Sequence, residues 1–216
     1  ILVMVIAVVF SRVHLPEIKH EETEEDRIKD TRIMKLFKHH PMFVFGLFSL
    51  LAYEIAEISI NSYFINFVTG QGWMDDNSAS MVLTVALGFF MVGRFLGSWI
   101  MRRIPAERML MYCSLGSVSC LGVVLLDIGH WSMYALIANY LFEAIMFPTI
   151  FSLSLQGLGN LTKSASSLLM MTPIGGCFFL LMGYVADQTN LVVPFLIPFI
   201  GYFIVLLYAS ELSRKS

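Results

Sequence analysis

Hydrophobic residues lie along this chain in long runs that short polar stretches separate. The runs cover 42–68, 79–101, 109–128, 131–156, 164–186 and 191–210. Each has at least about 20 residues, which as a helix rising about 1.5 Å per residue crosses a hydrocarbon core of about 30 Å. The alternation typical of barrel strands is missing. Because lipid cannot satisfy exposed backbone groups, the pattern predicts six transmembrane helices.

Composition supports this prediction. Hydrophobic residues make up 57% of the chain and charged residues only 14%. Both values lie outside the usual range of soluble globular domains. We therefore expect an all-α integral membrane protein.

The remaining segments divide the chain into four parts. The opening residues "ILVMVIAVVF" are apolar but reach only about half way across a bilayer as a helix. We interpret 1–11 as the end of a truncated transmembrane helix, 12–40 as a charged cytoplasmic linker, 41–211 as a six-helix bundle and 212–216 as a cytoplasmic tail. The chain is thus expected to be a fragment of a longer transporter.

Lysine and arginine residues mark alternate loops. Seven of them lie in 12–40, three lie near residue 105, one lies near residue 160 and two lie at the C-terminus, while the loops between these places have none. By the positive-inside rule, these basic segments and the C-terminus are cytoplasmic. The loops near Gly70 and His130 are then expected outside.

Motifs for catalysis or metal binding are missing from the sequence. The three cysteines have no CxxC spacing, and the five histidines form no HExxH pair. Neither a phosphate-binding glycine loop nor a GxSxG elbow occurs. We therefore expect no enzymatic activity, no metal site, no cofactor and no nucleic-acid partner.

Polar residues do occur inside the predicted spans, where an ionisable group costs about 2.5–3.5 kcal/mol to insert. In the first span they follow the spacing i, i+3 and i+7, and in the fourth i, i+4 and i+8, so each set lies near one helix face. Such residues either line a transport pathway or form a buried structural network. The polar residues are Glu54, Glu57 and Asn61 in the first span and Asn139 and Glu143 in the fourth, where the aromatic Phe147 continues the same face.

Glycines and prolines inside the spans predict local packing. Gly93 and Gly97 form a GxxxG pair, which typically lets two helices approach closely. Pro148 and Pro173 are expected to kink their helices and free backbone carbonyls beside the cavity.

Several segments resemble one transporter family. They are "YEIAEISINSYFINFV" (53–68), "GRFLGSWIMRRIP" (93–105), "FPTIFSLSLQGLG" (147–159), "TKSASSLLMM" (162–171) and "GG" followed by "MGYVAD" (175–187). From about residue 37 to 210, the chain resembles the C-terminal half of the sugar:proton symporters of the major facilitator superfamily, in the fucose and glucose/galactose permease group.

This resemblance implies twelve helices in two halves, around a cavity that opens alternately to each side of the membrane. The family's helices that match the first and fourth spans line that cavity. The resemblance therefore implies a substrate-binding set, and the positions of two residues within their spans indicate a gating or structural set. The first set is Glu57, Asn61, Asn139, Glu143 and Phe147, and the second is Glu54 and Arg94.

Arg94 is the only basic residue inside a predicted span. Unpaired, its charge would be costly there, so we expect a carboxylate partner. Glu143 is the expected partner, because the resemblance places the two helices side by side.

The function we expect is proton-coupled monosaccharide uptake, with L-fucose as the first candidate and glucose or galactose next. The partners are then the sugar, protons, the lipid bilayer and a missing N-terminal half, in which the family carries most of its proton-coupling acids. The expected location is a bacterial inner membrane. The alternatives are a noncatalytic membrane module, or a drug exporter of the same superfamily with a more apolar cavity.

Overall fold

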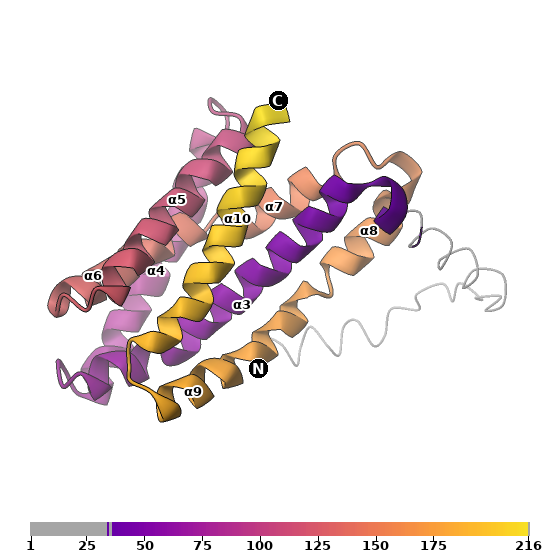
Figure 1. Ribbon diagram of the computed structural model, residues 1–216. Helices are drawn as coiled ribbons and strands as arrows, with labels where there is room; N and C mark the ends of the chain where they lie inside the picture. Colours follow the sequence, from indigo (N-terminus) through magenta and orange to yellow (C-terminus); the bar gives the residue numbers. More distant parts are fainter. Residues whose placement is uncertain (1–33, 35, 216) are drawn as a thin grey trace, which may run out of the picture.

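The computed structural model describes residues 34 and 36–215, and nearly all of them are helical (Figure 1). The predicted segment 1–11 and most of the predicted linker 12–40 lie outside these residues. The α-helices are α3 (Pro41–Gly70), α4 (Asp76–Ile100), α5 (Ala106–Leu125), α6 (His130–Glu143), α7 (Met146–Leu155), α8 (Thr162–Leu169), α9 (Phe179–Gln188) and α10 (Leu196–Lys215). Short 3-10 helices are η1 (Gly159–Leu161), η2 (Thr172–Phe178) and η3 (Val193–Phe195).

The predicted six spans are confirmed. Helices α3, α4 and α5 each form one span, α6 and α7 together form the fourth, and the segments Gly159–Gln188 and Val193–Arg214 form the last two. Each is long and apolar enough to cross a membrane. The expected all-α fold is therefore present.

Helix α3 occupies the centre of the bundle. It packs against α7, α10 and η2, and Figure 1 shows it running beside α10. In α3 and in the fourth span, 56% of an 18-residue apolar stretch is buried inside the protein, against 17% of the corresponding stretch in α4. Polar groups on α3 are therefore placed to meet the fourth span and α10 inside the protein.

Two spans are interrupted just before a proline, which confirms the predicted kinks. Pro148 has no N–H to donate to the carbonyl of Ala144, and α6 ends one residue before that carbonyl. In the fifth span, Pro173 likewise leaves the Leu169 carbonyl without its helical donor, and the hydroxyl of Thr172 donates to it at 2.8 Å. Side chains replace the hydrogen bonds that proline removes.

The glycine pair in α4 brings this helix against the fourth span, as predicted. A Cβ atom on Gly93 would lie 2.8 Å from the Leu141 carbonyl oxygen, and one on Gly97 would collide with the side chain of Ile145. Only glycine allows this approach. The close contact holds α4 beside the break between α6 and α7.

Loops that the topology places on one side of the membrane meet at one end of the bundle. The amide of Gln71 donates to Asp127 at 3.3 Å, and the ring of Trp73 stacks on His130 with centroids 5.2 Å apart. These contacts join the loop after α3 to the loop before α6, as alternating spans require.

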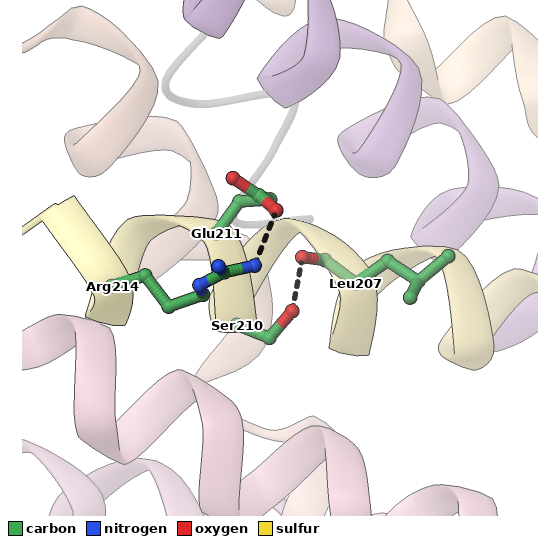
Figure 2. A network of polar contacts seen from close by, with 4 residues as sticks. All are labelled: Leu207, Ser210, Glu211 and Arg214. Atoms are coloured by element: carbon green, nitrogen blue, oxygen red, sulfur yellow. Dashed lines mark hydrogen bonds and ion pairs between the residues drawn. The ribbon is translucent and has the colours of Figure 1, made fainter.

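At the other end, α10 continues through most of the segment predicted as a tail. Figure 2 shows its last turns, where the Ser210 hydroxyl donates to the Leu207 carbonyl at 2.8 Å and Arg214 pairs with Glu211 at 3.5 Å. The Arg214 side chain is 79% exposed, so this ion pair adds little stability. The end of α10 is thus a polar, helical turn.

Candidate functional site

A cluster of polar side chains lies fully inside the bundle, beside the break in the fourth span. The amide Nδ2 of Asn139 donates to Oε2 of Glu143 at 2.8 Å, and the hydroxyl of Tyr202 in α10 donates to the same oxygen. Asn139, Glu143 and Tyr202 have no exposed surface. We call these three residues and Tyr53 the buried layer.

Tyr53 contacts Glu143 and Tyr202 of the buried layer and also the half-buried Phe147. Its hydroxyl donates to the Glu143 carbonyl at 3.0 Å. Its ring centroid lies 6.3 Å from that of Tyr202 and 6.5 Å from that of Phe147. Tyr53 is fully buried, whereas Phe147 is half-buried.

Four residues form a second, more accessible set, which we call the open face: Glu57, Asn61, Arg94 and Phe147. Glu57, Asn61 and Phe147 are half-buried, and Arg94 is exposed in the six-helix unit. The Glu57 carboxyl lies near the Tyr53 hydroxyl and within the field of the Arg94 charge. The Oδ1 atom of Asn61 is buried without a hydrogen-bond partner among the described residues. The open face thus offers a carboxyl, an amide, a guanidinium and an aromatic ring.

The polar side of α3 continues from the open face into a cavity of about 400 Å³ between α3 and α9. Ser62, Asn66, Tyr184 and Asp187 line the cavity together with Tyr63, whose buried hydroxyl has no partner in the described part of the chain. This volume lies in the range of small-molecule sites, roughly 300–1,000 Å³. A polar path therefore leads from Asn61 toward the end of the bundle that holds Gly70.

The predicted ion pair between Arg94 and Glu143 is wrong. Both residues are described, and no ion pair joins them. Instead, Nε of Arg94 donates to the Ala144 carbonyl at 3.2 Å, and its guanidinium lies 4.8 Å from the ring centre of Phe90. The reason is Pro148, which leaves the Ala144 carbonyl without a backbone donor. Arg94 supplies that donor.

Glu54 lies apart from both sets. Its side chain is 7% exposed, one turn before Glu57 and nearer the start of α3. Among the described residues it makes no side-chain hydrogen bond or ion pair. The structure thus joins Asn139 and Glu143 by a hydrogen bond and places Glu57 and Asn61 one turn apart on α3, while Phe147 packs near Tyr53.

Two residues of the buried layer were not among the predicted site residues. Tyr202 lies in an apolar helix that carries no other polar signal near it, and Tyr53 precedes the acidic pair of α3. A tyrosine at membrane depth was the available signal, because a buried hydroxyl needs a hydrogen-bond partner.

Comparison with known proteins gives the family. The sequence model of the family described as Major Facilitator Superfamily matches residues 1–179 of this chain. The chain belongs to this superfamily. Within it, the glucose/galactose transporter of Brucella abortus biovar 1 (strain 9-941) is 31% identical over 214 residues, which cover 98% of this chain and 51% of the transporter. The L-fucose-proton symporter of Escherichia coli (strain K12) is 30% identical over 167 residues, or 76% of this chain and 38% of the symporter.

A solved structure from the Major Facilitator Superfamily has the same arrangement of helices. The crystal structure of the transporter FucP in the outward conformation superposes with a TM-score of 0.81 at 25% identity, over 97% of this chain and 51% of that chain. This superfamily member is thus a multi-pass membrane protein whose six-helix unit corresponds to one half of FucP. The chain spans about half the length of the curated relatives it matches.

Proposed function

We propose that this chain is the C-terminal half of a proton-coupled monosaccharide transporter of a bacterial inner membrane. The observation that carries the proposal is the open face, where Glu57 and Asn61 lie one turn apart on α3 and Phe147 packs near Tyr53, the neighbour of Glu57. Sugar sites need hydrogen-bonding groups in a defined arrangement and an apolar wall, and this face offers both. Relatives named for sugars match nearly the whole chain.

In this proposal, direct contact with the sugar falls to the open face. Glu57 and Asn61 are one helical turn apart, so they can bind neighbouring hydroxyl groups of one ring. The Oδ1 of Asn61 is buried without a partner among the described residues, so rotation of this half-buried side chain would present an acceptor that a sugar hydroxyl satisfies. Phe147 supplies an aromatic surface for the apolar side of the sugar.

Asn139 and Glu143 contribute from the buried layer. They have no exposed surface, so a sugar reaches them only when Tyr53 or Phe147 moves. The N-terminal half supplies the opposite wall of the cavity, and relative motion of the two halves opens it to each side in turn.

L-fucose is the first candidate sugar, and glucose and galactose are the next. Relatives named for L-fucose and for glucose/galactose match this chain with nearly equal identity, 30% and 31%. A drug exporter would require a more apolar face than the one formed by Glu57, Asn61 and Arg94.

Uptake of each radiolabelled sugar by cells that express the full-length protein tests the proposal. We expect accumulation of at least one sugar, and its loss on adding a protonophore. Sugar accumulation that continues unchanged in the presence of the protonophore would contradict proton coupling. If none of the three sugars enters, the assignment as a transporter of these monosaccharides is wrong.

A further inference from the structure

The two oxygens of the Glu143 carboxyl have unequal surroundings. Oε2 accepts hydrogen bonds from Asn139 and from Tyr202. Oε1 is buried and has no partner in the residues that the structure describes. The Tyr140 hydroxyl on the same helix also lacks a partner, so it does not donate to Oε1. Oε2 thus accepts two hydrogen bonds, whereas Oε1 accepts none from the described residues.

Glu143 also lacks a cation. It has no exposed surface, and within 36–215 no ion pair reaches it. Arg94 donates to the Ala144 carbonyl instead. The charged group that faces Glu143 is a second carboxyl, that of Glu57 on α3. An ionised carboxylate without water or a cation is very costly to bury, so these surroundings favour the neutral acid.

The other groups around Glu143 are uncharged. Tyr53 comes from α3, Asn139 and Tyr140 come from α6, and Tyr202 comes from α10. None of these side chains can neutralise a carboxylate, although Tyr202 and Asn139 donate to one of its oxygens. Since none of these groups cancels the negative charge of the Glu143 carboxylate, a bound proton must do so.

Asn139 also has a buried oxygen without a hydrogen-bond partner. Its Nδ2 already donates to Glu143, while its Oδ1 is buried without a partner among the described groups. A neutral carboxylic acid has one O–H donor, and a primary amide has one carbonyl acceptor. A proton on Oε1 can donate to Oδ1, which satisfies both orphan oxygens at once. An ionised Glu143 leaves both oxygens without a hydrogen bond, which is costly inside a protein.

We propose that Glu143 and Asn139 form a carboxylic acid–amide pair, and that this pair is a proton-binding site within the six-helix unit. The role of the site in coupling rests on the proposed sugar transport, whereas the presence of the proton does not. Tyr53 donates to the Glu143 carbonyl, and its ring lies 6.5 Å from that of Phe147 on the open face. When these two rings move and water enters, the Oε1–H bond breaks, the proton passes to water as hydronium, and the carboxylate remains.

Infrared spectroscopy of the full-length protein in lipid tests for the proton directly. The wild type should show the C=O band of a protonated carboxylic acid at neutral pH. Glu143→Gln should remove that band, while the matched surface control Glu211→Gln should keep it. Glutamine preserves the shape and can donate to Asn139. If the Glu143→Gln variant retains every protonated-carboxyl band of the wild type, the proposal is overturned.

Asn139→Leu tests the pair itself and serves if Glu143→Gln does not fold. Leucine has a similar volume but no acceptor for the acid proton. The band should shift in frequency, because its O–H loses the amide partner. A band at the unchanged frequency would overturn the acid–amide pair.

Proton uptake measured together with sugar uptake tests the coupling role. In wild-type vesicles, sugar entry should make the medium alkaline, and Glu143→Gln should lower the number of protons taken up per sugar. An unchanged ratio would overturn the role of Glu143 in coupling. If wild-type vesicles take up no sugar, the proposed function fails, while the infrared result on the proton still stands.

Discussion

The Tyr53 hydroxyl in α3 donates to the backbone carbonyl of Glu143, 90 residues later in the chain, at 3.0 Å. That carbonyl ends α6, so it belongs to the last turn of a helix, where carbonyls lack intrahelical donors. Arg94 from α4 satisfies the next carbonyl, that of Ala144. Two helices thus supply the hydrogen bonds that the break before Pro148 requires.

Replacing Tyr53 by phenylalanine should lower the stability of the full-length protein by about 1–3 kcal/mol, because a buried carbonyl loses its donor. Thermal unfolding in detergent measures the change. Tyr112→Phe is the matched control, since the Tyr112 side chain is 55% exposed. Equal stability of the two variants would show that the Tyr53 hydrogen bond contributes nothing.

Arg94→Leu should also lower the unfolding temperature, because the Ala144 carbonyl loses its only side-chain donor in the described structure. The double variant Arg94→Leu with Glu143→Gln should be no more stable than Arg94→Leu, because the two residues do not form an ion pair. Recovery of stability in the double variant would show that Arg94 and Glu143 do form the ion pair predicted from the sequence.

Gly93→Ala should destabilise the contact between α4 and the fourth span by about 1–3 kcal/mol, as overpacking generally does. Its Cβ would lie 2.8 Å from a backbone oxygen, which cannot move aside easily. Gly88→Ala in the same helix is the control, because its Cβ would meet nothing within 4 Å in the part of the chain described. A similar loss in both variants would contradict this packing.

Hydropathy and proline positions allowed the six spans and both helix breaks to be predicted, because both features act on the local chain. The partner of Arg94 was predicted wrongly, because Arg94 donates to a backbone carbonyl and not to the predicted carboxylate. Pro148 was nevertheless a readable signal, since a proline always orphans the carbonyl four residues earlier. Tyr202 was missed because its role depends on a hydrogen bond from α10 to Glu143 at the end of α6, which no pattern within α10 records.

Sidedness of the loops remains a prediction from the distribution of basic residues. In a variant that lacks Cys113, Cys120 and Cys177, single cysteines at Asp75 and at Glu107 should react with an impermeant reagent from opposite sides of the membrane. The positive-inside rule places Glu107 in the cytoplasm. Labelling of both positions from the same side would refute the six-span topology.

Equilibrium sugar binding to the purified full-length protein shows whether the open face is the sugar site. Asn61→Ala should weaken binding by about fivefold or more, equivalent to about 1 kcal/mol for one lost hydrogen bond. Glu57→Gln should also weaken binding, while Asn77→Ala, an exposed asparagine in the first turn of α4, should leave it unchanged. Wild-type affinity in both Asn61→Ala and Glu57→Gln, with lowered thermal stability, would show that these residues are structural and that the open face does not bind the sugar.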